Sequence, residues 1–175
     1  VFQLQAPLSA WGDTAVGEYR PSHDYPGIST LVGLLGAALG LRREDEAAHA
    51  ALRDAYGYAV GLQSSGRLLR GYHTAQVPSQ ASLKKRPHAS RRDELAIPRH
   101  DLNTILSTRD YRQDAGFLVA VQAGDDSPYS LATLGDALRK PRFVLYLGRK
   151  ACPPGAPLHP QLIEAVTAEQ AFDSY

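Results

Sequence analysis

Three cationic side chains and a tyrosine near residue 145 have the chemistry to bind a phosphate-rich ligand. Arg142, Arg149 and Lys150 flank a predicted strand at 142–147 and the turn after it, and Tyr146 lies between them. A guanidinium group fits the paired oxygens of a phosphate, and a tyrosine ring can stack on an unpaired base. The other interpretation is an ordinary solvent-facing strand end. The residue types alone leave both open.

Four further residues are candidates for the same chemistry. Arg20 precedes a proline turn beside the start of a predicted helix, and phosphate binding is the favoured interpretation there. Ser29 is expected to offer its hydroxyl to the first unpaired N–H groups of that helix, whose N-terminus attracts anions. Arg109 and Tyr111 lie at the base of a predicted arm, where RNA contact and a purely structural role are equally expected.

The positive charge of the chain is concentrated in its middle. The net charge is only +1, but residues 67–112 carry ten basic and four acidic side chains. A local excess of this kind favours a phosphate-rich partner, although a solvated surface loop is the commoner cause of a charged run. The most basic part could contact RNA, DNA, a neighbouring subunit or only water. It comprises Lys84, Lys85, Arg86, Arg91 and Arg92.

Catalysis is considered and not expected. Metal-free RNA cleavage needs a general base near the 2′-OH and a cation for the developing charge, which His23, His73 and Lys150 could supply. Nothing in the sequence brings these three together, and His73 is more simply a structural residue in a strand. The single cysteine, Cys152, excludes an internal disulfide and a cysteine cluster for zinc. We therefore expect no catalytic residues, metal or cofactor, and a reducing, cytoplasmic setting without a signal peptide.

Periodicity predicts an α+β fold. The expected elements, in order, are a strand at 1–5, a long loop at 6–27, helices at 29–40 and 44–55, strands at 56–63 and 116–123, a helix at 129–138, a strand at 142–147 and a short helix at 161–172. Strand, helix, strand, insertion, strand, helix, strand is the ferredoxin-like pattern, an antiparallel sheet with two helices on one face. RNA-recognition modules use the same architecture.

The insertion at 67–112 is predicted to be a long β-hairpin. Its two ends, 67–77 and 103–112, are rich in β-compatible residues, whereas the tract between them is too polar to bury a core of its own. We expect a basic tip that becomes ordered when a partner binds.

Three glycines mark the first predicted helix. Gly33, Gly36 and Gly40 each cost roughly 0.8–1 kcal/mol relative to alanine, and together they form one bare stripe. The stripe predicts that another backbone approaches the helix closely. The apolar run at 28–41 is too short for a membrane span, which needs about 20 residues. Trp11, the only tryptophan, is expected to pack in the core or a loop.

A set of short motifs, taken together, resembles a known family. The motifs are PLSAWG at 7–12, EYRPS at 18–22, LLGAALG at 34–40, YHT at 72–74, DAGF at 114–117, KPRF at 140–143 and YLGRKACP at 146–153. In this order and spacing they resemble the CasD family of subunits of Cascade, the type I-E CRISPR surveillance complex. That family belongs to the fifth family of Cas proteins, in the RAMP superfamily.

The resemblance covers about residues 1–160 and implies both architecture and role. It implies a ferredoxin-like palm at 1–160 with the thumb hairpin at 67–112, and a helical segment at 161–175 that begins a further C-terminal part. The implied role is to cap the 5′ handle of the CRISPR RNA without catalysis, beside the adjacent backbone subunit and the large subunit. Target DNA would be met through the assembled complex, with no membrane involved.

The chain departs from that pattern in two places, and two alternatives stay open. Family members often carry a basic residue where Ile28 stands, and relatives usually continue beyond Tyr175. One alternative is a metal-independent endoribonuclease that processes CRISPR precursor RNA. The other is a protein scaffold whose basic arm docks on an acidic partner.

Overall fold

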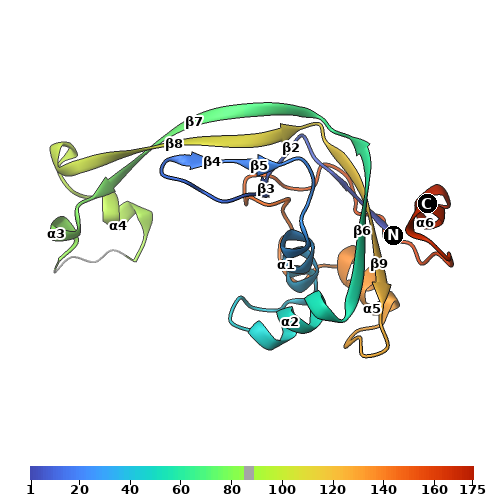
Figure 1. The fold of residues 1–175 in the computed structure, drawn as a ribbon. Coiled ribbons are helices and arrows are strands. Elements are labelled where there is room, and N and C mark those ends of the chain that lie inside the picture. The colour runs from blue at the N-terminus through green and yellow to red at the C-terminus, as the bar shows by residue number, and fades with distance from the viewer. Residues whose placement is uncertain (85–88) are drawn as a thin grey trace.

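The central element is a three-stranded antiparallel sheet. A computed structural model describes residues 1–84 and 89–175 of the chain. The sheet has the order β1 (Phe2–Gln5), β9 (Gly116–Ala123), β6 (Tyr56–Ser64), and Figure 1 shows it beneath a long hairpin. These three strands confirm the strands predicted at 1–5, 116–123 and 56–63. Their alternating side chains place Phe117 and Val119 in the core, both fully buried.

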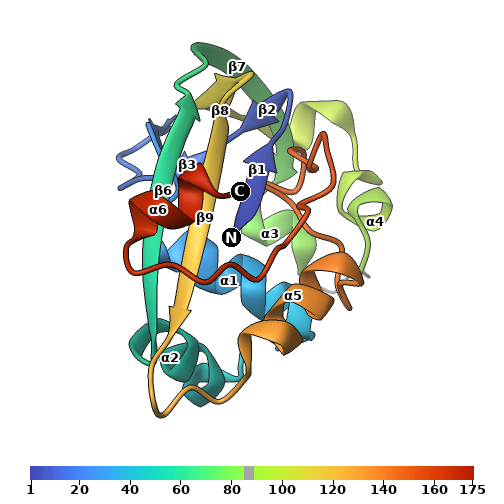
Figure 2. The same ribbon diagram turned by 90° about the vertical axis from the view of Figure 1, so that its right-hand side faces the viewer.

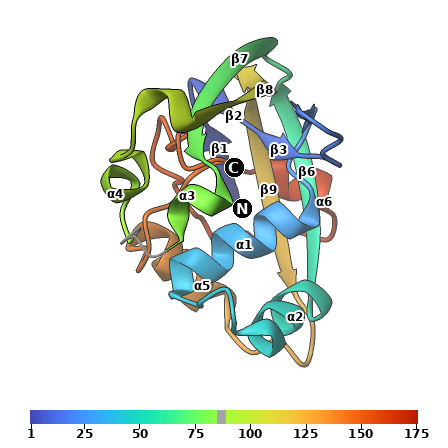
Figure 3. The same cartoon turned by 90° about the vertical axis from the view of Figure 1, so that its left-hand side faces the viewer.

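Two helices cover one face of the sheet, and a third short helix lies on the other. α1 (Ile28–Leu39) and α5 (Leu131–Arg139) pack together on the first face (Figure 3). α2 (Glu46–Asp54) packs beside α1. α6 (Ala168–Asp173) lies against β6 and β9 on the opposite face (Figure 2), so the helix predicted at 161–172 is confirmed only in its second half.

The hairpin predicted at 67–112 is confirmed. β7 (Arg67–Pro78) and β8 (Leu102–Gln113) pair antiparallel without a register shift, from Arg67 opposite Gln113 to Pro78 opposite Leu102. Figure 1 shows the hairpin extending away from the sheet.

The tip of the hairpin is more regular than the polar sequence predicts. It contains α3 (Gln80–Leu83), α4 (Arg91–Leu95) and a 3₁₀ turn (Arg99–Asp101). Ser79 caps α3, and Ser90 and Asp93 form a capping box at the start of α4. Such caps satisfy the first N–H groups of a helix locally, without a buried core. The described part of the tip is therefore organised by short-range hydrogen bonds.

The long loop at 6–27 is laid along the hairpin. It forms four two-residue strands: β2 (Leu8–Ser9), β3 (Trp11–Gly12), β4 (Tyr19–Arg20) and β5 (Ser22–His23). β2 and β4 both pair with β8, and β3 pairs with β5. Trp11 is 1% exposed and meets Phe117 edge-on, with ring centroids 5.6 Å apart, which confirms its expected place in the core.

The prediction of a strand at 142–147 is wrong. The N–H groups of Arg142 and Phe143 donate instead to the carbonyl oxygens of Ala38 and Ala37, at 3.0 and 3.2 Å. These carbonyls belong to the last turn of α1, where the regular helix bonds end; that of Ala37 also accepts a 3.2 Å bond from the N–H of the C-cap residue Gly40. The apolar run of this segment thus caps a helix end, with Leu145 and Leu147 buried.

A different segment lies along the free edge of β1, where the fourth strand of a ferredoxin-like sheet would lie. The N–H of Gly155 donates to Gln5 at 2.8 Å, and the N–H of Gln3 donates to Leu158 at 2.9 Å. Pro157 and Pro160 have no N–H to donate, and His159 has a φ of 47°, so no regular ladder forms. The antiparallel α+β class is confirmed, and this arrangement is compatible with the ferredoxin-like order.

The glycine stripe of α1 faces side chains, so the predicted close approach of another backbone is wrong. A Cβ on Gly36 would lie 2.6 Å from Cε1 of His49, and one on Gly40 would lie 2.6 Å from Cδ of Arg142. A Cβ on Gly33 would have nothing within 4 Å. Gly40 ends the helix in the left-handed conformation with a φ of 85°.

Candidate nucleic-acid interface

A tight turn after the segment 142–147 holds the candidate site together. The Leu147 carbonyl accepts a hydrogen bond from the N–H of Ala10 at 3.1 Å, and its N–H donates to Cys152 at 2.7 Å. The N–H of Cys152 in turn donates to Arg149 at 2.8 Å, and Gly148 has a φ of 84°. Burial raises the pKa of the Cys152 thiol. The backbone of this turn is thus fixed on both sides of Arg149.

Arg149 joins three parts of the chain that are distant in sequence. Its Nη1 donates to the carbonyl of Asp110 at 2.8 Å, and its Nη2 donates to the carbonyl of Arg20 at 3.0 Å. Its guanidinium carbon lies 4.6 Å from the centre of the Tyr111 ring. Arg20, Tyr111 and Arg149, all singled out from the sequence, are therefore neighbours. A guanidinium has five N–H donors, so two internal bonds leave others for a ligand.

One face of the hairpin base carries arginines that form no ion pair within the part of the chain that the structure describes. Arg109 and Tyr111 are two residues apart in β8, so their side chains lie on the same face. Arg20 of β4 is paired with Arg109, which places its side chain on that face as well. Opposite Arg109, β7 has only Gly71. Arg109 donates to the Ser107 hydroxyl at 3.1 Å, and Arg20 donates to the Gly17 carbonyl at 2.6 Å. Across the described residues, neither of these arginines nor Arg149 forms an ion pair with an acidic side chain. We call Arg20, Arg109 and Arg149 the cationic face.

The opposite face of the hairpin is electrically balanced. Asp110, only 3% exposed, accepts hydrogen bonds from Arg70 at 2.8 and 3.1 Å and from the Tyr19 hydroxyl at 2.5 Å. The Arg70 guanidinium holds the pKa of this carboxyl below its usual value, against the opposing effect of burial. On the same face Arg112 pairs with Asp24.

Sequence reasoning missed Tyr19, Arg70 and Asp110. Arg70 and Asp110 are 40 residues apart, and they meet only because the hairpin register places them opposite one another. Neither residue stands in a local motif with a chemical signature. The pairing register is the signal that would have found them.

The other predicted contacts lie apart from the cationic face. Arg142 lies across Gly40 at the end of α1, and Tyr146 and Lys150 are exposed on either side of the turn. Ser29 is exposed in the first turn of α1, but it does not cap the helix. The N-cap is Gly27 and makes no side-chain cap bond, so the predicted capping role of Ser29 is wrong. No hydrogen bond or ion pair of the described residues links these side chains to Arg149.

The basic tip residues differ in how firmly they are held. Arg91 forms an ion pair with Glu94 at 2.7 Å and also donates to the Gln76 carbonyl. Lys84 and Arg92 are exposed. Lys85 and Arg86 lie outside the described residues.

The side chains considered for catalysis have separate neighbours. His73 Nε2 lies 3.5 Å from the Tyr111 hydroxyl, whereas His23 Nε2 lies 3.3 Å from Asp13. Lys150 is exposed beyond Arg149. Within the described residues, no group of three or more His, Cys, Asp or Glu side chains is placed to hold a metal ion. None of the helices described there is long and apolar enough to cross a membrane.

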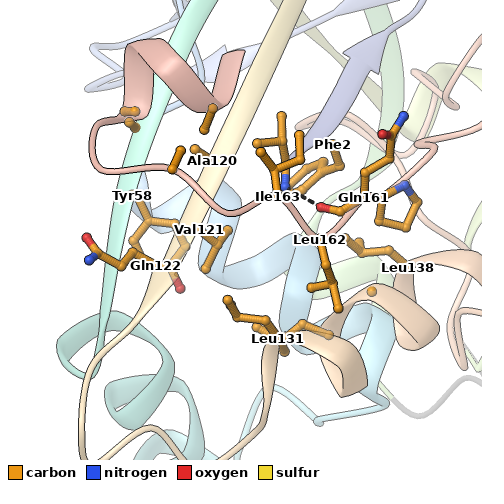
Figure 4. Close-up of a pocket in the computed structure, with 18 of the residues that line it drawn as sticks. Phe2, Tyr58, Ala120, Val121, Gln122, Leu131, Leu138, Gln161, Leu162 and Ile163 are labelled. Carbon is orange, nitrogen blue, oxygen red and sulfur yellow. Dashed lines mark hydrogen bonds between the residues drawn. The ribbon is translucent and has the colours of Figure 1, made fainter. Parts of the chain in front are cut away.

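An apolar cavity of about 360 Å³ lies beside the sheet, α5 and the segment at 160–168. Figure 4 shows Phe2, Val121, Leu131 and Ile163 around it, with the bond between Val1 and Gln161 at its edge. None of the eight side chains predicted to bind RNA outside the tip lines this cavity. It is therefore separate from the cationic face.

Comparison with known proteins agrees with the motifs in the sequence. The profile of a family described as "CRISPR-associated protein (Cas_Cas5)" matches residues 1–175. The chain is 31% identical over 183 aligned residues to the CRISPR system Cascade subunit CasD of Escherichia coli (strain K12), covering all of this chain and 75% of that protein.

Two solved structures share the fold. A chain of a CRISPR RNA-guided surveillance complex matches with a TM-score of 0.63 and 30% identity, over 90% of this chain and 61% of that one. A structure described as a Cas protein matches with a TM-score of 0.62 and 31% identity, over 97% of this chain and 67% of that one. The chain thus spans about three fifths of the length of the matched surveillance-complex chain. It belongs to the Cas5 family of CRISPR-associated proteins.

Proposed function

We propose that this chain is a non-catalytic RNA-binding subunit of a CRISPR surveillance complex in the cytoplasm, and that it caps the 5′ handle of the CRISPR RNA. Its partners would be the CRISPR RNA, the adjacent backbone subunit and the large subunit, with target DNA reached through the assembled complex. The observation that carries the proposal is the cationic face in a chain 31% identical to a Cascade subunit. The experiment below also distinguishes this role from the two alternatives, an endoribonuclease and a protein scaffold.

The geometry suits a phosphate backbone better than an acidic protein surface. Arg149 is held by two carbonyl oxygens and by the Tyr111 ring, so its guanidinium is oriented before any ligand arrives. A cation held in this way loses little conformational entropy on binding. Arg20 and Arg109 extend the charge along the hairpin base, where successive phosphates of one strand could lie.

The test is co-expression of the full-length protein with the other subunits of its complex and a CRISPR array. We expect a uniform short RNA to co-purify and to remain intact without metal. Binding of a synthetic handle RNA should weaken steeply with salt, because each neutralised phosphate releases counterions. A handle RNA of scrambled sequence and equal length is the control.

Three results would contradict the proposal. Defined metal-free cleavage of repeat RNA that is lost in His73→Ala would establish the endoribonuclease. Assembly with the protein partners without any RNA, and without dependence on salt, would establish the scaffold. Equal affinity for the handle and the scrambled RNA would remove the specific role in capping.

A further inference from the structure

We propose that Tyr19, Arg70 and Asp110, here called the Asp110 cluster, position the cationic face by holding the N-terminal loop against the hairpin. The inference rests on the proposed function, since it assigns positioning residues to the same RNA site. None of the three side chains needs to contact RNA for this role. They act through the backbone of β4 and β8.

The part of the N-terminal loop from Gly12 to Arg20 has few other contacts to hold it in place. Every residue from Gly12 to Arg20 is exposed, so this stretch buries almost no apolar surface of its own. Its pairing with β8 is only two residues long, with one further backbone bond from Thr108 to Glu18 at 3.0 Å. The Tyr19 hydroxyl, donating to Asp110 at 2.5 Å, ties the middle of the loop to the hairpin.

Asp110 is suited to this task because its carboxylate is buried and both of its oxygens accept hydrogen bonds. Three hydrogen bonds reach its two oxygens, two from Arg70 and one from Tyr19. Arg70 also donates to the Tyr19 hydroxyl at 3.0 Å and lies over the tyrosine ring, 5.2 Å from its centre. Loss of the Arg70 side chain would leave Asp110 Oδ1 without a donor, and loss of the Tyr19 hydroxyl would leave Oδ2 with only the 3.1 Å bond from Arg70, so the three side chains act together.

The cluster is connected to the RNA-binding face through the backbone. The carbonyl of Asp110 accepts a bond from Arg149, and the other donor of Arg149 holds the carbonyl of Arg20. Arg20 directly follows Tyr19. If β4 moves away from β8, Arg20 moves with it and Arg149 loses one of its two anchors.

The decisive variant is Tyr19→Phe in the full-length protein. It keeps the aromatic ring under Arg70 and removes only the hydroxyl donor. Tyr58→Phe is the matched control, because the Tyr58 hydroxyl also donates a 2.6 Å bond, to the carbonyl of Leu52, and Tyr58 lies near the start of β6, whereas the hairpin follows the end of that strand. Asp110→Asn is a second variant that preserves shape and removes the charge.

The first measurement is handle-RNA affinity as a function of salt. We expect Tyr19→Phe to weaken binding about tenfold, the effect of losing a hydrogen bond to a charged group. The slope of log affinity against log salt should stay at the wild-type value, because Arg20 still reaches its phosphate in the complex and the lost affinity is the cost of ordering the loop again. Arg149→Ala, by contrast, should reduce that slope by about 1. Wild-type affinity in Tyr19→Phe, or a reduced slope, would overturn the inference.

The second measurement is amide hydrogen exchange without RNA. Residues 13–20 should exchange faster in Tyr19→Phe, with β6 and β9 unchanged and Tyr58→Phe indistinguishable from wild type in that loop. Unchanged exchange of this loop in Tyr19→Phe would also overturn the inference. This result does not depend on whether Asp110→Asn folds. If the wild-type protein does not bind handle RNA, the proposed function fails, whereas the exchange experiment still tests the cluster.

Discussion

Gly148 lies directly against the carbonyl oxygen of Ala10: a Cβ built on Gly148 would stand 1.5 Å from that oxygen. Gly148 also has a φ of 84°, in the left-handed region that side chains avoid. No L residue fits this position without moving one of the two backbones. The turn that presents Arg149 therefore requires glycine.

We accordingly expect Gly148→Ala to destabilise the protein by about 3 kcal/mol and to abolish handle-RNA binding. Urea denaturation and an RNA-binding titration are the measurements. Gly12→Ala is the matched control, since nothing lies within 4 Å of a Cβ there and its φ is not positive. Gly148→Ala with wild-type stability would show that the turn can rearrange at little cost.

The two interior glycines of α1 should respond in opposite directions to substitution. Gly33→Ala should stabilise the protein by roughly 0.8–1 kcal/mol, because it improves helix propensity and meets no neighbour. Gly36→Leu should destabilise it by about 1–3 kcal/mol, because His49 occupies the space and is held by a 3.0 Å contact with the Arg42 carbonyl. Both predictions are tested by urea denaturation, where a change in stability shifts the midpoint and leaves the m-value unchanged. A neutral Gly36→Leu would mean that His49 swings away freely.

Arg149→Ala should weaken handle-RNA binding about tenfold, and Lys84→Ala and Arg91→Ala less than about twofold. Arg149 is oriented by two carbonyl oxygens, whereas Lys84 is exposed at the tip. The tip changes should act on assembly with the neighbouring subunit or on target DNA. The measurement is affinity at one fixed salt concentration, with Arg53→Ala on α2 as a surface-charge control. Equal losses, or a larger loss at the tip, would move the primary RNA site onto the tip.

Asp110 should make part of the stability dependent on pH. Its pKa is lower in the folded chain than in the unfolded chain, so its contribution is complete above the unfolded value of about 4 and disappears as the pH falls through the folded value. Wild type should therefore lose more stability than Asp110→Asn between pH 5 and pH 3. Urea denaturation at both pH values measures the difference, and the other carboxylates cancel in the comparison. Parallel losses would contradict the assigned pKa shift.

The sequence predicted best those elements whose pattern is local. The strand at Gly116–Ala123 is confirmed residue for residue, and the first hairpin strand differs by only one residue, Pro78. The failure at 142–147 has a tertiary cause. An apolar run resembles a strand, but the N–H groups of Arg142 and Phe143 were taken by the end of α1, which periodicity cannot show.

The candidate site was likewise predicted only where the signal was local. The residue types of Arg20, Tyr111 and Arg149 suggested RNA contact, and the motif resemblance named the family. Their mutual contacts depend on how three distant segments pack, and the partnership of Arg70 with Asp110 depends on register. The assignment of these residues to RNA is still a prediction.

The uninterrupted register of the hairpin limits how its length can change. β7 and β8 each have twelve residues, so at about 3.4 Å per residue the tip lies roughly 40 Å from the base. Removing one residue from each strand would shorten the reach by that single step, but it would also exchange the two faces of everything beyond the deletion. Only even-numbered insertions or deletions in both strands keep the tip facing the same way, so related hairpins that serve the same neighbour should differ in length by steps of two.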